Sequence, residues 1–198
     1  MNAVKVPVTL KTRLGWDDDM LNAPQIAARA EEAGITMITI HGRTRCQFYK
    51  GAADWAAIAG VKQAVSIPVI ANGDIISTDA ARQALAQSGS DGVMIGRGAQ
   101  GKPWLLAQVA HDLFGAPAPV IPQGAEFARM VADHYEAIIR FYGEVIGLRV
   151  ARKHLGWYMD TSNTPADLRR AMLTASSPAD VHRLIPSACL PDHQLEAA

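Results

Sequence analysis

Polar and charged side chains stand at the ends of four short apolar runs, and their types suit an anionic ligand. These side chains are Lys11 and Arg13, His41 and Arg43, Asn72 and Asp74, and Arg97. In a barrel of parallel strands, side chains at the carboxyl ends of the strands point into the active site. Charges there are costly to bury without a partner, so a phosphorylated ligand facing them is a natural explanation.

Two glycine turns strengthen this interpretation. Asn72-Gly73-Asp74 follows Ile-Pro-Val-Ile-Ala, and Gly96-Arg97-Gly98 follows Asp-Gly-Val-Met-Ile. Either turn alone is ordinary loop sequence. In (β/α)8 barrels, however, the loops after the last two strands often hold a phosphate, because glycine lets backbone N–H groups approach it. The order and spacing of the two turns therefore predict a phosphate clamp.

The elements that must position these residues alternate between strands and Ala-rich helices. The expected strands are Val8–Lys11, Thr36–Ile40, Ile67–Ala71 and Gly92–Ile95. Helices are expected over Ala23–Ala33, closed by Gly34 as a C-cap glycine, around Trp55 to Val61, and over Thr78–Gln87. This alternation is typical of βα units on a parallel sheet. Residues 1–115 are thus predicted to form four βα units.

Residues 116–198 are predicted to form a small helical domain. Pro103 suits the first turn of a helix through Trp104 and Val109, and a proline-containing linker spans Gly115 to Gly124. Beyond it, Phe127, Val131, Tyr135 and Ile138 recur at helical spacing. An eight-stranded barrel needs about 250 residues. Four βα units therefore indicate half of a barrel or a small open sheet.

Several candidate residues also have purely structural explanations. Lys11 and Arg13 could form the solvent face of an edge strand, and His41 could be a satisfied structural histidine. Arg149, Arg152 and Lys153 share one helical face, which is either solvated or a footprint for a phosphate backbone. Trp157 and Tyr158 are expected to pack in the helical core.

Composition excludes several classes of protein. The 198 residues carry 19 acidic and 19 basic side chains, so no global field indicates nucleic acid or membrane binding. Cys46 and Cys189 lie far apart without metal-ligand spacing, so neither a disulfide framework nor a metal site is expected, and Cys46 is interpreted as a loop residue. No secretion signal or bilayer-length apolar run is present, which predicts a cytoplasmic protein.

Four runs of the sequence closely resemble tRNA-dihydrouridine synthases, nearest to the bacterial B-type branch. They are Pro-Val-Thr-Leu-Lys11-Thr-Arg13-Leu-Gly-Trp, Ile-Thr-Ile-His41-Gly-Arg43-Thr-Arg, Ile-Pro-Val-Ile-Ala-Asn72-Gly73-Asp74-Ile and Val-Met-Ile-Gly96-Arg97-Gly-Ala-Gln-Gly-Lys-Pro-Trp. The run Gly-Leu-Arg149-Val-Ala-Arg152-Lys153-His154-Leu-Gly-Trp157-Tyr158 resembles the helical domain of that branch. The resemblance implies the C-terminal half of an FMN-binding TIM barrel, strands five to eight, followed by a tRNA-binding all-α domain.

The family resemblance also implies an activity and roles for the candidate residues. These enzymes reduce uridine to dihydrouridine in tRNA, with NADPH reducing FMN first. Lys11 would contact the flavin ring system, and His41 would lie beside flavin and substrate. The residues expected at the phosphate and ribityl end of FMN are Asn72, Gly73, Asp74, Gly96 and Arg97. Arg13 and Arg43 are expected to face the flipped uridine or its neighbours, and Arg149, Arg152 and Lys153 to face tRNA.

One departure from the family pattern concerns the catalytic acid. The family's proton-donating cysteine precedes the strand at which this sequence begins, and neither Cys46 nor Cys189 matches its motif. We therefore expect no catalytic residue here, a C-terminal portion in which Met1 is an internal methionine, weak flavin binding and no efficient turnover. Two alternatives remain: another FMN-dependent TIM-barrel oxidoreductase, and a non-catalytic RNA-binding fragment that pairs half-barrels in a homodimer.

Overall fold

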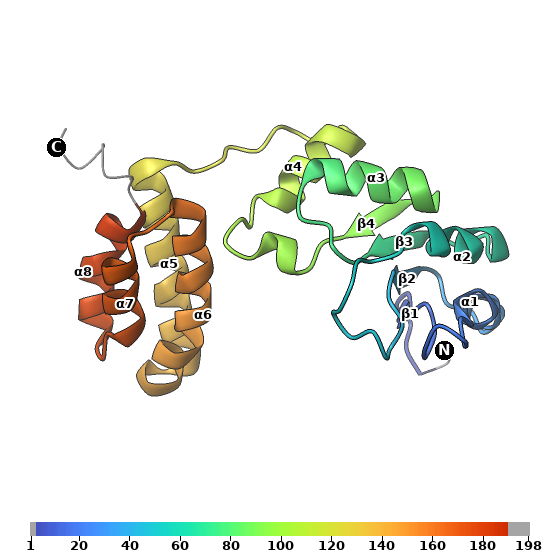
Figure 1. Cartoon of the computed structure of the whole chain (residues 1–198), viewed down its shortest axis with the longest axis horizontal. Helices are drawn as coiled ribbons and strands as arrows, with labels where there is room; N and C mark the ends of the chain where they lie inside the picture. Colours follow the sequence, from blue (N-terminus) through green and yellow to red (C-terminus); the bar gives the residue numbers. More distant parts are fainter. Residues whose placement is uncertain (1–2, 190–198) are drawn as a thin grey trace. The chain divides into compact units, whose positions relative to one another are not determined.

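The computed structural model describes residues 3–189, which form two compact units (Figure 1). Within the described residues, the first unit runs to Ala99 and resumes over Leu105–Ala118, and the second comprises Gln100–Trp104 and residues 119–189. The sequence-based boundary lies between residues 115 and 116. The short Gln100–Trp104 segment, which that boundary places with the strands, belongs to the helical unit.

The first unit is an α/β structure with a four-stranded parallel sheet in the order β1-β2-β3-β4. The α/β class and the parallel sheet predicted from the alternating pattern are confirmed. Its strands are β1 (Leu10–Arg13), β2 (Ile38–His41), β3 (Val69–Asn72) and β4 (Gly92–Met94). Its helices are α1 (Ala23–Glu32), η1 (Ala56–Ile58), α2 (Ala59–Ala64), α3 (Thr78–Ser88), η2 (Arg97–Ala99) and α4 (Leu105–Phe114).

Strand register gives the sheet two chemically different faces. Ile38, Ile40, Val69 and Ala71 are fully buried and pack with α-helical residues such as Ala27 in one core. Because side chains alternate across a strand, the neighbouring positions point away from that core. There, Arg13 pairs with His41 and His41 with Asn72, so three polar residues form one row across β1, β2 and β3.

Strand β1 ends two residues later than the apolar pattern predicts, and β2 and β3 each end one residue later. Arg13, His41 and Asn72 are the last residues of β1, β2 and β3, whereas the sequence pattern placed each just beyond its strand. The reason is that backbone pairing continues through these residues. Their side chains are therefore held by the sheet itself, which fixes their directions more firmly than a loop does.

Helix α4 begins at Leu105, after Pro103 and Trp104 rather than through them. Its predicted start is wrong because the preceding segment packs elsewhere. The Thr161 hydroxyl donates a hydrogen bond to the Gly101 carbonyl, and the Trp104 ring lies edge-on to Phe127 at 5.9 Å between centroids. Both partners belong to the helical unit.

The second unit contains α5 (Gly124–Tyr142), α6 (Glu144–Ser162), α7 (Ala166–Thr174) and α8 (Pro178–Cys189). The four apolar positions predicted for one face of α5 are all buried: Phe127, Val131, Tyr135 and Ile138. Tyr158 on α6 joins their core, as expected, while Trp157 is half-buried. Within residues 3–189, no helix is both long and apolar enough to cross a bilayer.

Candidate functional site

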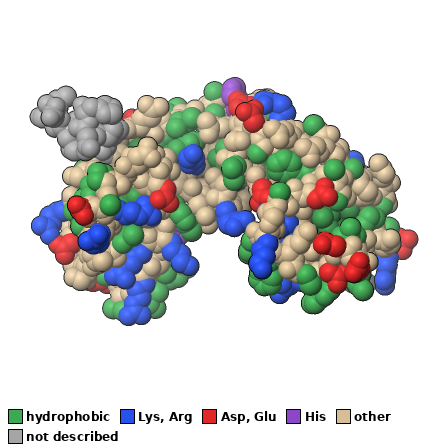
Figure 2. Space-filling view, in the orientation of Figure 1, with side chains coloured by type: hydrophobic (Ala, Val, Ile, Leu, Met, Phe, Trp, Pro, Cys, Tyr) green, Lys and Arg blue, Asp and Glu red, His purple; other side chains and the backbone are tan. Residues whose placement is uncertain are grey.

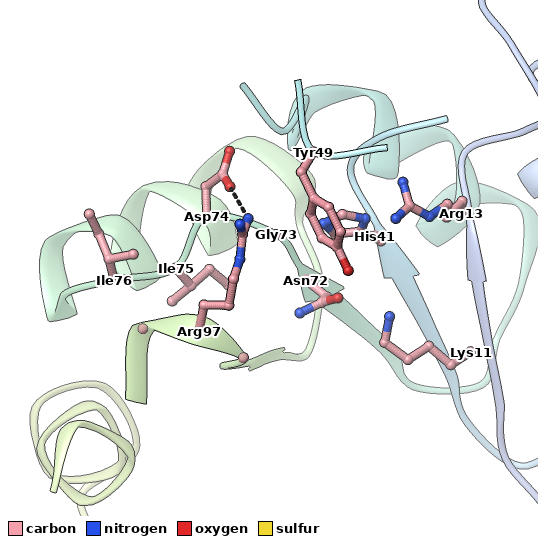
Figure 3. A pocket seen from close by; sticks show the side chains of 12 residues that line it. Lys11, Arg13, His41, Tyr49, Asn72, Gly73, Asp74, Ile75, Ile76 and Arg97 are labelled. Carbon is pink, nitrogen blue, oxygen red and sulfur yellow. Dashed lines mark ion pairs between the residues drawn. The ribbon is translucent and has the colours of Figure 1, made fainter. Parts of the chain in front are cut away.

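A pocket of about 380 Å³ opens at the carboxyl ends of the strands in the first unit (Figure 3). Six of the seven polar residues that end the apolar runs line it: Lys11, Arg13, His41, Asn72, Asp74 and Arg97. Gly73, Gly96 and Gly98 line it too, so the structure brings both predicted glycine turns to one cavity. The pocket thus joins side chains from all four βα units.

His41 and Lys11 line this pocket from the neighbouring strands β2 and β1. His41 is 7% exposed, and burial, together with the charges of Arg13, Lys11 and Arg43, lowers its pKa to about 4. Burial and the Arg13 charge also lower the pKa of Lys11. At neutral pH, the imidazole is therefore neutral and can donate one hydrogen bond and accept another.

Arg43, which the family resemblance predicts to face a substrate, is buried and is not among the residues that line the pocket. Its side chain is 3% exposed, and its two terminal nitrogens donate to the two Asp74 oxygens at 2.9 and 2.6 Å. Burial would raise the pKa of Asp74, but hydrogen bonds from Arg43 and the Ala53 amide hold it below the ordinary carboxyl value. Asp74 is therefore engaged mainly with protein groups.

The same arginine supports the loop that follows β2. Arg43 donates to the Lys50 and Gly51 carbonyls, and Arg13 donates to the Thr44 and Phe48 carbonyls at 2.8 and 2.9 Å. Arg13 therefore has a structural role as well as lining the pocket. The two guanidinium groups hold the loop of residues 44–51 in place beside the cavity.

Tyr49, which the sequence patterns did not single out, comes from this loop and lines the pocket. The Arg97 guanidinium lies 4.5 Å from its ring centroid and that of Arg13 lies 5.7 Å away. Figure 3 shows the ring between the two arginines, with its hydroxyl toward Asn72. The only hint of Tyr49 in the sequence was an aromatic residue in a polar loop, eight positions after His41. No known motif spacing links such a residue to the pocket.

The two glycine turns differ in what surrounds them. Gly73 has φ +114°, and a Cβ there would come within 2.8 Å of the His41 ring and of Ala53. Asp74 follows at φ 53°, a conformation that Asp tolerates better than most residues. A Cβ at Gly96, in contrast, would meet no atom within 4 Å. The first turn is filled by protein, and the second leaves open space beside Arg97.

The predicted basic residues of α6 lie in the other unit. Arg149, Arg152 and Lys153 are all exposed, and no ion pair involving them is found within residues 3–189. The neighbouring His154 ring packs edge-on against His134 and Trp157, and burial, with the His134 charge, lowers its pKa. His154 is thus a packing residue, and the three cations form the charged face.

Neither cysteine stands among titratable partners at the pocket. Cys46 is exposed in the loop after β2, and Cys189 is buried in α8, where burial raises its pKa to about 12. A thiol with so high a pKa is a poor nucleophile or acid catalyst at neutral pH. In the described part of the chain, no group of three His, Cys, Asp or Glu side chains is placed to hold a metal ion.

With this geometry in place, comparison with known proteins identifies the family. The family model described as "Dihydrouridine synthase (Dus)" matches residues 1–193. The chain belongs to the dihydrouridine synthase family. This confirms the resemblance drawn from the four strand-end runs and the helical run.

Curated relatives of this dihydrouridine synthase family member cover nearly all of it. A "Probable tRNA-dihydrouridine synthase" of Rhodobacter capsulatus is 61% identical over 95% of this chain and 57% of the relative. One of Rickettsia conorii is 53% identical over 87% of this chain and 52% of the relative. The "tRNA-dihydrouridine synthase B" of Pseudomonas syringae pv. tomato is 46% identical over 97% of this chain and 58% of the relative. The chain therefore spans little more than half the length of these relatives.

A solved mandelate oxidase structure shares 15% identity with this family member, with a TM-score of 0.40 over 93% of this chain and 62% of the other. The family assignment rests on the sequence matches alone. The matched region includes both glycine turns and the basic face of α6.

Replacing Arg43 should destabilise the chain. In Arg43→Met, the Asp74 carboxylate and two loop carbonyls lose their partner, which should cost about 3 kcal/mol in the free energy of unfolding. Because the folded pKa of Asp74 is lowered, its contribution is present above its unfolded pKa and is lost as the pH falls through the lowered value. Urea unfolding at pH 7 and at pH 3 measures both effects. Arg45→Met, at an exposed position, should change the free energy of unfolding by less than about 0.5 kcal/mol. Equal losses in the two variants would contradict the stabilising role of the buried Arg43 side chain.

His41 should remain neutral in the folded chain until the pH approaches about 4. The unfolded state, with a pKa near 6.5, binds the proton first, so His41 makes the fold progressively less stable as pH falls from 6.5 toward 4. NMR titration of the imidazole carbons measures the pKa directly. The unfolding free energy of His41→Gln should depend less on pH across that window, and titration of His41 near 6.5 would refute the burial argument.

Proposed function

We propose that this chain carries the FMN-phosphate-binding and RNA-binding parts of a tRNA-dihydrouridine synthase. The observation that carries the proposal is the pocket at the strand ends, where Lys11, Arg13 and Arg97 face one cavity beside an open glycine turn. The one carboxylate lining it, Asp74, is already paired with Arg43. The cavity therefore carries excess positive charge, which favours a phosphorylated cofactor.

The residues present fit the phosphate end of FMN. Arg97 is 58% exposed on its side chain and lies 3.9 Å from Asp74, so it is free enough to turn toward an anion. Gly96 leaves its immediate surroundings open, so a phosphate can approach the backbone there. Asn72 donates to the Met94 carbonyl at 2.8 Å, which ties the two glycine turns together. Gly73 and Asp74 are packed against other protein groups. We therefore propose that they support the phosphate-binding residues rather than contact the phosphate themselves.

The flavin would supply hydride chemistry, with NADPH as the reductant that regenerates it. The side chains of this chain would bind the cofactor and orient the reacting rings. Lys11 presents a cation and His41 a neutral imidazole at adjacent positions of the same sheet face, where they can hydrogen-bond carbonyl oxygens of an isoalloxazine or a uracil ring. Neither cysteine lines the pocket, so we assign the role of proton donor to neither of them.

We also propose that the first unit is half of a (β/α)8 barrel. Four parallel βα units with helices packed on one sheet face and polar side chains on the other match half of a (β/α)8 barrel, in which the inner face is enclosed by further strands. Strands β1 and β4 form the two edges of the sheet within the described residues. Edges of this kind pair with other strands, either from a longer polypeptide or from a second copy in a homodimer. Sedimentation of the chain distinguishes the two.

Binding of FMN against riboflavin tests the cofactor proposal. The two differ by the phosphate alone, so the chain should bind FMN at least about tenfold more tightly, the value of one charge-assisted contact. Arg97→Ala should abolish this preference while leaving riboflavin affinity unchanged. Flavin fluorescence quenching measures both.

A pair of glycine variants provides the matched control. Gly96→Ala places a methyl group in open space beside Arg97 and should weaken FMN binding without changing the unfolding temperature. Gly60→Ala, in α2 with its nearest neighbour at 3.7 Å, should change neither. Equal affinity for FMN and riboflavin in the unmodified chain would reject the phosphate site.

The basic face of α6 is the proposed RNA contact of the helical unit. Arg149, Arg152 and Lys153 stand at positions i, i+3 and i+4, so their charges lie on one side of the helix. Figure 2 shows Lys and Arg side chains gathered over the helical unit. Unpaired cations on one exposed helix face suit a phosphate backbone.

Salt dependence of tRNA binding tests this face. Arg152→Ala/Lys153→Ala should weaken binding and reduce the slope of log affinity against log salt by about 1 to 2, one unit per lost phosphate contact. Arg29→Ala/Arg170→Ala removes the same charge from other exposed positions and should leave the slope unchanged. An unchanged slope in the first variant would remove α6 from the footprint.

The same two binding assays separate the alternative functions. FMN binding without tRNA binding would favour another FMN-dependent oxidoreductase. Salt-sensitive tRNA binding without flavin would favour a non-catalytic RNA-binding fragment. Binding of both, with bleaching of the flavin on addition of NADPH, is the result expected here.

A further inference from the structure

Arg45 and Phe48 form an exposed stacked pair beside the pocket, and none of the roles discussed above uses it. The Arg45 guanidinium lies 4.4 Å from the centroid of the Phe48 ring, and Phe48 is 54% exposed. The Phe48 ring also meets Tyr49 edge-on at 6.4 Å, and Tyr49 lines the pocket. The pair therefore continues the pocket wall outward to the surface.

The loop that carries this pair is firmly held. Four of its carbonyls, those of Thr44, Phe48, Lys50 and Gly51, accept hydrogen bonds from Arg13 or Arg43. The Cys46 amide donates to the Trp16 carbonyl at 2.8 Å, which fastens the loop to the one after β1. Phe48 is thus exposed from a fixed backbone, so little ordering is needed when it meets a ligand.

Phe48 also has an unfavourable backbone conformation. Its φ is +56°, in the left-handed region that bulky side chains rarely adopt. Such strain persists only where the surroundings impose it, and it concentrates at ligand-binding positions. Glycine or asparagine would fit the turn with less strain, so the aromatic ring is explained by what it contacts and not by the backbone.

The chemistry of the pair matches an unpaired RNA base. Proteins bind single-stranded RNA by stacking splayed bases on aromatic rings or on arginine guanidinium planes, with cations near the phosphates. Within the described residues, Arg45 makes no ion pair, and the guanidinium groups of Arg13 and Arg97 lie 5.7 and 4.5 Å from the centroid of the Tyr49 ring. The Arg45–Phe48 surface is therefore aromatic and cationic, and the Arg45 charge is not paired with a carboxylate within the described residues.

We propose that the Arg45–Phe48 pair stacks on the base of a nucleotide adjacent to the one that enters the pocket. This inference rests on the proposed function and deepens it, because it names where the RNA chain runs as it leaves the site. A neighbouring base held there would keep the strand open beside the target. The pair would then contribute to RNA affinity and to the choice among uridines with different neighbours.

Binding of a fluorescent hairpin RNA tests the proposal. The hairpin carries one uridine in its loop with adenosines on both sides, and fluorescence anisotropy measures its Kd for the full 198-residue chain. Phe48→Ala should raise the Kd roughly 5- to 100-fold, the range for losing one stacked base. Phe48→Trp should restore affinity, whereas Phe48→Leu, which keeps bulk without an aromatic face, should not.

Abasic versions of the hairpin identify the contact. Each replaces one of the two flanking adenosines, and one of them should bind the unmodified chain as weakly as Phe48→Ala binds the intact hairpin. On that abasic hairpin Phe48→Ala should cause no further loss, because the partner base is already missing. Additive losses on both hairpins would overturn the stacking proposal.

Matched controls separate stacking from folding and charge. Phe114→Ala removes another aromatic side chain, 52% exposed, at the end of α4, and Arg29→Ala removes an exposed charge from α1; both should bind as the unmodified chain does. Circular dichroism melting should show all the variants folded. If the unmodified chain fails to bind the hairpin, the proposed function itself fails. If it binds and Phe48→Ala binds equally, or if Phe48→Ala only dissociates a dimer in sedimentation, this inference fails and the proposed function stands.

Discussion

The ion pair between the buried Arg43 and the partly exposed Asp74 is the interaction on which the site depends. It joins residues 31 positions apart, at the ends of two neighbouring strands, through two hydrogen bonds of 2.9 and 2.6 Å. Because the arginine is buried, it also donates to two loop carbonyls, so one side chain holds both the first glycine turn and the loop of residues 44–51. A buried charge without its partner is strongly destabilising, so loss of Asp74 or of Arg43 should disturb both the glycine turn and the loop.

Pairing Asp74 also decides the electrostatics of the pocket. With the carboxylate neutralised by Arg43, the remaining charged groups at the cavity are Lys11, Arg13 and Arg97. Burial, together with the charges of Arg13, Lys11 and Arg43, lowers the pKa of His41 and keeps the imidazole neutral. The site can therefore attract an anion while presenting an uncharged hydrogen-bonding group to a ring, a combination that suits the phosphorylated flavin proposed above. The outer loop then adds an aromatic and cationic surface whose position depends on the same buried arginine.

Much of the fold could be predicted from the sequence because its periodicities are strong. The βα alternation predicted the parallel sheet, and helical spacing identified the buried face of α5, since both reflect burial of apolar side chains against a core. Strand ends were less accurate: hydrogen bonding carried β1 to Arg13 and β2 to His41, beyond the apolar residues. The start of α4 was missed because Trp104 packs against Phe127, a contact between distant residues that no local pattern contains.

For the site, the sequence by itself determined which chemical groups are available: cations and amides at strand ends, and glycines after two strands. Register and strand direction then bring them together, as any parallel sheet would. Only the tertiary structure decided their roles. It buried Arg43 as a clamp, although its position in the sequence resembles that of the pocket residues, and it brought Tyr49 from a loop to the cavity wall. Spacing specifies which face a residue occupies on its own element, whereas burial and partners depend on contacts between elements far apart in the chain.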